Sequence, residues 1–333
     1  MLPWFQDGNF PLYLAPMAGF TDIGFRKLCK EKGADVVVSE FVLADAILRG
    51  DPKTWNSIEF TEDQRPMGIQ IFGSEADVMA DAARMIVDRL NPTFIDLNFG
   101  CPAKKVTCKN AGSSLLRDLP LLGNICESVV KALPDCPVTA KIRIGWDGES
   151  LVAPEAGRLL ESVGIQALAI HGRTKAQGYK GDANWDIINE TAAEISIPVI
   201  GNGSINYQYD IRELRERYQV NGLMIGRAAI GNPWLFENLK SLLETGEPSS
   251  PPSVEERWDY VLRYAEIMRG HYAHLRTDMI LGIMKGRLVS FVAGFPGARK
   301  LRNRISRLQS FEEIHELRDE SLVTLRELGT SVV

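Results

Sequence analysis

The chain has few cysteines and no spacing that pairs them. Five cysteines are spread over 333 residues, and none of them forms a Cys-x-x-Cys pair. An odd number without close pairs argues against a disulfide framework and against a zinc or iron–sulfur site. We therefore expect no bound metal, and thiols that stay reduced.

Long apolar runs are also missing. Residues 1–7 have neither a basic start nor an apolar stretch long enough for secretion, and no later run approaches a membrane span. The first predicted strand is followed by Ala-Pro-Met instead of the Gly-x-Gly-x-x-Gly of a dinucleotide-binding fold. These absences predict a cytoplasmic protein that does not associate with membranes and does not begin with a Rossmann turn.

Charge is unevenly distributed along a chain of otherwise ordinary globular composition. The net charge is −5, yet residues 257–308 contain eleven Lys or Arg residues and only three acids. Such asymmetry predicts that the basic part faces a polyanion.

Eight short apolar runs bounded by turn residues recur over the first 230 positions, with helical patterns between them. The runs are residues 12–15, 36–39, 68–72, 95–98, 138–142, 167–170, 198–200 and 223–225. Thr21 is placed to cap the first helix and Gly33 to end it. This alternation favours a TIM (β/α)8 barrel over an open doubly wound sheet.

The exits of these runs carry the candidate site residues, most of which are polar. In strand order they are Pro16-Met17-Ala18, Glu40, Gln70, Asn98 with Cys101, Lys141 with Arg143, His171 with Arg173, Asn202 with Gly203, and Gly226 with Arg227. Each one alone has a structural explanation, such as a loop cap or a satisfied core histidine. In a barrel all of them converge on one mouth, so together they predict a bound polar ligand there.

The exits of the last two strands suggest a phosphate on that ligand. They read Gly-Asn-Gly-Ser at 201–204 and Gly-Arg at 226–227. Glycines let a phosphate approach backbone N–H groups, and Arg227 can add a two-pronged contact. The alternative is that these glycines only make tight turns.

Cys101 lies between Gly100 and Pro102 at the exit of the fourth run. Proline restrains the residue before it, so the thiol is held on a stiff turn. A buried structural cysteine is the alternative, but such a residue needs no turn of this kind.

A Pro/Ser-rich segment separates the barrel from a helical pattern. We expect a barrel over residues 1–243, a linker at 244–254 and a small all-α domain over 255–333. Residues 299–307 contain no acid and include Arg299, Arg302 and Arg304, which predicts contact with a phosphate backbone. Solvated helix faces are the alternative for any single arginine.

Six ordered motifs make the chain resemble the tRNA-dihydrouridine synthases, most closely the bacterial B-type. The motifs lie at residues 15–26, 96–102, 141–146, 171–185, 201–203 and 225–234. Departures are Cys108 and Asn110 after the catalytic loop, and Ser204 where the family usually has an acid. A serine hydroxyl can still cap a helix or meet a phosphate.

The resemblance implies an FMN enzyme that reduces particular tRNA uridines, with NADPH or NADH as electron donor. Hydride would pass from flavin N5 to uracil C6, and Cys101 would protonate C5 as a general acid. The implied FMN-binding residues are Pro16, Met17, Ala18, Gln70, Lys141, His171, Asn202, Gly203, Ser204, Gly226 and Arg227. The implied substrate residues are Asn98, Arg143, Arg173, Arg299, Arg302 and Arg304.

The same resemblance implies a monomer that binds tRNA with its helical domain and takes an extruded uridine into the barrel mouth. Two other functions stay open. A flavin barrel acting on a small molecule, as dihydroorotate dehydrogenases do, would explain the mouth but not the basic tail. A noncatalytic RNA-binding protein would explain the tail but not the mouth.

Overall fold

The computed structural model describes residues 2–6, 8–206, 211–295 and 297–327. The chain divides into two compact units. One comprises Met1–Ala18 and Ala34–Gly226, and the other comprises Gly19–Gly33 and Arg227–Val333.

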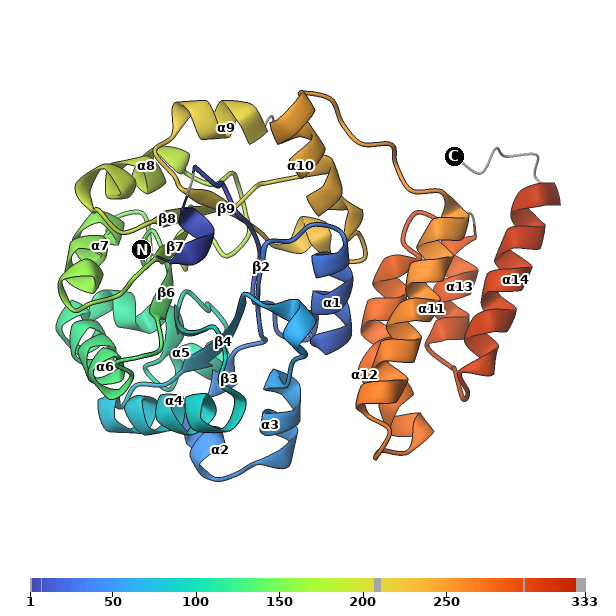
Figure 1. Ribbon diagram of the computed structural model, residues 1–333, viewed down its shortest axis with the longest axis horizontal. Helices are drawn as coiled ribbons and strands as arrows, with labels where there is room; N and C mark the ends of the chain where they lie inside the picture. The colour runs from blue at the N-terminus through green and yellow to red at the C-terminus, as the bar shows by residue number, and fades with distance from the viewer. Residues whose placement is uncertain (1, 7, 207–210, 296, 328–333) are drawn as a thin grey trace. The chain divides into compact units, whose positions relative to one another are not determined.

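The first unit is a closed barrel of parallel strands (Figure 1). Its strands are β1 (Leu12–Leu14), β2 (Val36–Val38), β4 (Met67–Phe72), β5 (Phe94–Phe99), β6 (Val138–Arg143), β7 (Leu168–His171), β8 (Val199–Asn202) and β9 (Gly222–Ile225). Strand β1 pairs with β2 and β9, and β2 pairs with β4, which closes the ring. The predicted TIM barrel is therefore confirmed, with each predicted run overlapping one strand. A two-residue strand, β3 (Val42–Leu43), pairs with β4 outside this ring and was not predicted.

Helices connect the strands and surround the barrel (Figure 1). They are α2 (Ala44–Leu48), α3 (Pro52–Ile58), α4 (Ala76–Leu90), α5 (Lys104–Thr107), α6 (Leu119–Ala132), α7 (Ala153–Ser162), α8 (Trp185–Glu194) and α9 (Ile211–Arg217), with 3-10 turns η1 (Pro3–Phe5), η2 (Glu62–Gln64) and η3 (Gly112–Arg117). Local sequence sets several helix starts. Asp118 caps α6 by accepting a hydrogen bond from Leu121 N, and a proline follows within the first turn, where it removes no helical hydrogen bond.

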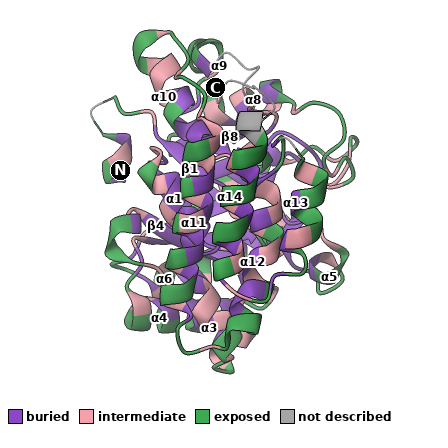
Figure 2. Cartoon of the chain, turned by 90° about the vertical axis from the view of Figure 1, so that its right-hand side faces the viewer, coloured by how far each residue is buried: buried purple, intermediate pink, exposed green. Residues whose placement is uncertain are grey.

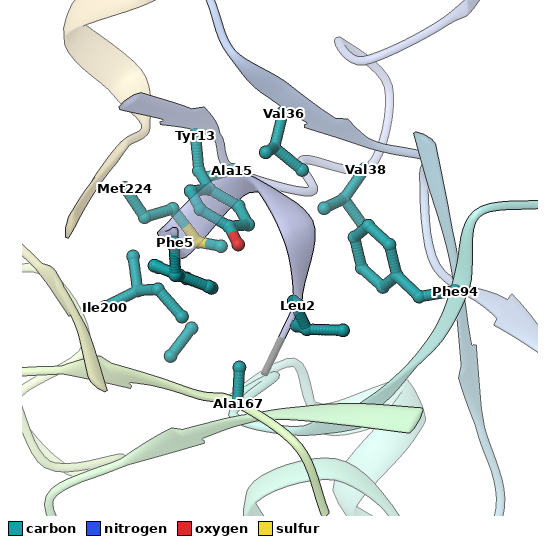
Figure 3. Close-up of a cluster of buried hydrophobic side chains, with 11 residues drawn as sticks. Leu2, Phe5, Tyr13, Ala15, Val36, Val38, Phe94, Ala167, Ile200 and Met224 are labelled. Atoms are coloured by element: carbon teal, nitrogen blue, oxygen red, sulfur yellow. The ribbon is translucent and has the colours of Figure 1, made fainter. Parts of the chain in front are cut away.

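The amino-terminal segment fills the barrel interior at one end. Leu2 and Phe5 are buried against the inward-facing residues Tyr13, Phe94 and Ile200 (Figure 3). The Phe5 and Tyr13 rings stack with their centroids 6.2 Å apart. Because this apolar layer occupies one end of the barrel, polar side chains are left to the carboxyl ends of the strands.

The second unit is helical. It contains α1 (Ile23–Glu31), η4 (Arg227–Ala229), α10 (Trp234–Thr245), α11 (Val254–His271), α12 (Thr277–Phe291), α13 (Ala298–Ile305) and α14 (Glu312–Glu327). Buried and exposed residues alternate along α11 and α12 (Figure 2). An all-α unit at the carboxyl end is thus confirmed, while its assignment to tRNA binding stays a prediction.

A buried polar cluster joins α1 to two later helices of this unit. Asp22, not Thr21 as predicted, caps α1 by accepting a hydrogen bond from Phe25 N. Its carboxylate also accepts one from the Tyr264 hydroxyl at 2.8 Å and lies 2.8 Å from Arg287 Nε. Asp22 directly precedes the first helical residue, so its carboxylate, rather than the Thr21 hydroxyl, lies at the N3 amide. Gly33 follows the helix with φ 98°, as a left-handed terminator should.

Among the described residues, no helix is both long enough and apolar enough to cross a bilayer.

Candidate active site

Successive strands bring polar side chains to the carboxyl end of the barrel. Gln70, Asn98, Lys141, His171 and Asn202 come from β4, β5, β6, β7 and β8. Strand register places Asn98 beside Lys141 and His171 beside Asn202. The structure therefore brings five of the predicted residues to one mouth.

Hydrogen bonds link Gln70 to the turn that carries the thiol. Asn98 Nδ2 donates to Gln70 Oε1 at 2.7 Å. Asn98 Oδ1 accepts from Gly100 N at 3.1 Å and from Cys101 N at 2.9 Å. Two N–H groups thus occupy this oxygen, so Nδ2 is the part of Asn98 suited to contact a ligand, and it can only donate.

The thiol of Cys101 is nearly enclosed, with the residue 9% exposed. Burial raises the pKa of the Cys101 thiol, although a backbone hydrogen bond at Ala103 and the positive charges of Arg143, Lys105 and Lys141 lower it in part. The group is therefore protonated at neutral pH and suited to donate a proton rather than to attack as a thiolate.

The loop after Cys101 returns to it. Ser113 donates from both N and Oγ to the Cys101 carbonyl, at 3.2 and 2.9 Å. Asn110 has φ 51°, a left-handed conformation that asparagine adopts more readily than most residues. The side chain of Cys108 is exposed. The left-handed conformation explains why an asparagine stands at position 110. The geometry gives no comparable reason for a cysteine at position 108.

Lys141 is a half-buried cation at the mouth. Its Nζ donates to Asn202 Oδ1 at 3.3 Å. The pKa of Lys141 is lowered to about 8, chiefly by burial and also by the Arg143 charge, while the Asp96 and Cys101 charges oppose this shift. Lys141 is thus mostly charged at pH 7 and ready to stabilise a developing negative charge.

Arg143 is buried and bound to backbone carbonyls. Its Nε donates to the Gly100 carbonyl at 2.8 Å, and its Nη1 donates to the carbonyls of Thr174 and Gly178 at 2.8 and 2.9 Å. These bonds join the thiol loop to the loop after β7. The predicted contact of Arg143 with substrate stays a prediction.

Arg173 lies among the predicted FMN residues. One nitrogen, Nη2, donates to Ser204 Oγ at 2.8 Å, and Nη1 lies 3.2 Å from His171 Nε2. Because an arginine can only donate, a hydrogen bond at this contact has His171 Nε2 as its acceptor. This geometry puts a guanidinium charge at the predicted phosphate loop, whereas the resemblance assigned Arg173 to substrate.

The glycines of the mouth differ in how much space surrounds them. A side chain at Gly203 would meet Ala183 Cβ at 2.8 Å and His171 Cδ2 at 2.9 Å, and its φ is 122°. A Cβ at Gly226 would meet nothing closer than Ala15 Cβ at 3.8 Å and Met17 Sδ at 3.9 Å. The fold thus requires glycine at 203, while at 226 a methyl group would make only ordinary contacts with the protein.

The remaining predicted residues lie near strand ends or in the helical unit. Pro16 and Met17 are half-buried and Ala18 is exposed just after β1. Arg227 is exposed at the start of η4 and belongs to the second compact unit. In the same unit, Arg299 and Arg302 are exposed on α13. Arg304 forms an ion pair with Glu320 of α14.

Sequence reasoning missed Asp96 and Thr139, which lie inside the barrel next to Gln70. Asp96 Oδ2 accepts from Gln70 Nε2 at 2.6 Å, and Oδ1 accepts from the Thr139 hydroxyl at 2.6 Å. A carboxylate in the middle of an apolar strand was the available signal, because charge is rarely buried without partners.

A cavity of about 620 Å³ lies at the opposite, amino ends of the strands. Its lining includes Phe10 before β1, Ile197 before β8 and Asn221 before β9. None of the predicted site residues lines it. We therefore place the candidate site at the carboxyl ends of the strands, where parallel barrels carry their chemistry.

The fold defines an α/β-barrel protein, with a candidate ligand site at the carboxyl ends of its strands. Solved structures support the fold alone. The old yellow enzyme from Trypanosoma cruzi matches with a TM-score of 0.52 and 11% identity, covering 74% of this chain and 90% of that one. A structure described as TcOYE with pHBA matches with a TM-score of 0.53 and 12% identity, covering 72% and 90%.

Sequence comparisons identify the family. The model of the family "Dihydrouridine synthase (Dus)" matches residues 13–326. The tRNA-dihydrouridine synthase B of Pseudomonas syringae pv. tomato is 41% identical over 90% of this chain and 88% of its own. A probable tRNA-dihydrouridine synthase of Rickettsia bellii is 36% identical over 89% of each chain. The chain belongs to the dihydrouridine synthase family.

Proposed function

We propose that this protein reduces specific uridines of tRNA to 5,6-dihydrouridine, using FMN and NADPH. The observation that carries the proposal is a buried, protonated thiol, Cys101, held beside Asn98 and the Lys141 cation at the mouth of a dihydrouridine synthase barrel. The names of the similar proteins support tRNA as the substrate. The basic stretch on the helical unit is consistent with a polyanionic partner.

The residues present suit a flavin with a phosphate. The lack of a side chain at Gly226 and the donors of Arg173 and Ser204 suit a phosphate-bearing end. Lys141 supplies a positive charge for the polar edge of the ring system. The proposed FMN-binding set is the one implied by resemblance: Pro16, Met17, Ala18, Gln70, Lys141, His171, Asn202, Gly203, Ser204, Gly226 and Arg227.

The bound flavin would supply the hydride that reaches uracil C6, and NADPH would reduce the flavin again. The chain's own residues would do the rest. Asn98 would orient the extruded base through its Nδ2 donor, and Cys101 would give its proton to C5. Because its pKa is raised, the thiol would stay protonated until it donates to the substrate.

The parts of the chain predicted from the sequence would have different roles. Residues 1–243 would carry the chemistry and residues 255–333 would bind tRNA, joined by residues 244–254. In the structure α10 ends at Thr245 and α11 begins at Val254, where Ser253 and Glu256 form a capping box. Residues 328–333 of the proposed tRNA-binding domain lie outside the described residues.

Two measurements test the proposal. The purified protein should show flavin absorption bands near 375 and 450 nm (roughly, from general flavin optics), or gain them with FMN. With NADPH and tRNA lacking dihydrouridine, it should form dihydrouridine detectable by mass spectrometry. A protein that turns over free uracil-like compounds without RNA would instead be a small-molecule enzyme. A colourless protein that binds tRNA but does not bind added FMN would be a noncatalytic RNA-binding protein.

A further inference from the structure

Gln70, Asp96 and Thr139 lie side by side on three neighbouring strands. Strand register pairs Gln70 of β4 with Asp96 of β5, and Asp96 with Thr139 of β6. All three are buried, with exposures of 0, 4 and 6%. The Asp96 carboxylate uses one oxygen for Gln70 and the other for Thr139. The Asp96 carboxylate lies inside the barrel, yet it has no role in the proposed chemistry.

Hydrogen-bond polarity runs in one direction between this carboxylate and the backbone of Gly100 and Cys101. An ionised carboxylate only accepts, so it requires the Nε2 end of Gln70. Gln70 Oε1 then faces Asn98, and it requires the Nδ2 end of that amide. Asn98 Oδ1 is thereby turned toward the N–H groups of Gly100 and Cys101. In every bond of this series, the group nearer Asp96 accepts and the group nearer Cys101 donates.

We infer that Asp96 is a positioning residue that fixes the orientation of the Gln70 and Asn98 amides and, through them, holds the backbone that carries Cys101. We call the chain Asp96–Gln70–Asn98–Cys101 the amide relay. This inference rests on the proposed function, because it gives Asp96 a part in presenting the proposed acid.

Stability alone does not account for a carboxylate here. Burial raises the pKa of Asp96, while the Thr139 and Gln70 hydrogen bonds and the Lys141 charge lower it. Well-packed apolar residues often replace buried charged groups without loss of stability. Only an obligate acceptor, however, forces both amides into a single orientation. The relay therefore predicts effects on the thiol turn at Gly100 and Cys101, which follow Asp96 by four and five residues.

The test is hydrogen exchange of the backbone amides of residues 98–101 in the flavin-free protein, measured by mass spectrometry. In Asp96→Asn the new amide can present an N–H to Gln70, so the orientation is no longer enforced. We expect the Gly100 and Cys101 amides to exchange at least about tenfold faster. Thr139→Val removes the bond to the other oxygen of Asp96 and leaves Gln70 in contact, so it is the matched control, expected within about twofold of the parent.

A second variant guards against loss of folding. Gln70→Leu breaks the relay between Asp96 and Asn98 and leaves the carboxylate in place. It should accelerate exchange at the same two amides, and the double variant with Asp96→Asn should add little more, because both changes break one chain. Residues 12–14 of β1 serve as an internal reference for global loosening. Exchange at residues 100–101 that is unchanged in both variants, or raised equally in Thr139→Val and at β1, would overturn the inference.

Activity separates this inference from the proposed function. If the parent reduces tRNA uridines, Asp96→Asn should lower the rate of dihydrouridine formation while flavin binding changes less than about threefold. If the parent forms no dihydrouridine, the proposed function fails, and the exchange experiment still decides whether the relay exists. Parent-like exchange together with parent-like turnover in both relay variants would reject the relay alone.

Discussion

Arg143 Nε donates a hydrogen bond of 2.8 Å to the carbonyl oxygen of Gly100, the residue before Cys101. The same guanidinium reaches the loop after β7 through the carbonyls of Thr174 and Gly178. It thus joins two loops of the barrel mouth. Its removal would leave buried carbonyls without their donor, which is costly in a protein interior.

Arg143→Ala should therefore destabilise the flavin-free protein. Three lost charge-assisted hydrogen bonds at a buried site predict a loss of about 3–5 kcal/mol in the free energy of unfolding. Urea denaturation followed by circular dichroism measures this. Arg84→Ala, at an exposed ion pair on α4, is the control and should change stability by less than about 1 kcal/mol. Parent-like stability with a raised KM for tRNA would make Arg143 a substrate residue only.

Cys101→Ala should retain bound flavin and NADPH oxidation but lose most dihydrouridine formation. Removal of a general acid predicts a fall of roughly 10²–10⁴-fold in the rate of substrate reduction. Quenched single-turnover reactions with reduced enzyme, analysed by mass spectrometry of the tRNA, give that rate. Cys108→Ala removes an exposed thiol seven residues further along and should keep the parent rate. An equal rate in Cys101→Ala and the parent would remove Cys101 from the proposed role.

Lys141→Met should stabilise the flavin-free protein at neutral pH. The pKa of Lys141 is lowered from 10.5 to about 8 in the folded protein. Between those two pKa values the unfolded chain binds more protons at this residue than the folded protein does. The free energy of unfolding therefore rises with pH across that window. Below the window, the cost of burying this charge is fully present.

The expected gain at pH 7 is on the order of 2 kcal/mol, shrinking toward pH 10.5. Urea denaturation of parent and variant at both pH values measures it. Lys131→Met, at an exposed ion pair on α6, should show no such pH-dependent gain. If Lys141→Met destabilises equally at both pH values, the ammonium carries no burial cost.

The barrel could be predicted from sequence because each strand is a short apolar run with turn residues on both sides. The residues of the mouth could be predicted for the same reason, since they lie in the later part of those runs or just after them. The amide relay could not, because Asp96 and Thr139 lie within strands, where only the register across β4, β5 and β6 shows that they meet. The backbone contacts of Arg143 and Arg173 depend on loop conformation, which local patterns do not specify.

Gly226→Ala should separate ligand binding from stability. A Cβ there would make only ordinary contacts with Ala15 and Met17, so the melting temperature of the flavin-free protein should change by less than about 3 °C. If a flavin phosphate approaches this backbone, the added methyl should weaken FMN binding by tenfold or more, or about 1.4 kcal/mol. Quenching of FMN fluorescence gives the dissociation constant.

The contrasting variant is Gly201→Ala, whose Cβ would lie 2.4 Å from the Trp185 ring. It should lower stability by about 1–3 kcal/mol, because the ring has to move. FMN affinity unchanged in Gly226→Ala would place the phosphate elsewhere.

Arg302 and Arg304 should differ in their contribution to tRNA binding, although both lie on α13. Arg304 is paired with Glu320 of α14, which neutralises part of its charge, whereas Arg302 is exposed. Neutralising Arg302 by Arg302→Gln should therefore weaken tRNA binding and lower the slope of log K against log salt by about 1. The same change at Arg304 should have a smaller effect, and Glu320→Gln should strengthen binding by releasing the Arg304 charge. Filter binding across a salt series measures all three. Identical slopes in the parent and Arg302→Gln would mean that α13 is a solvated surface and that tRNA is held elsewhere.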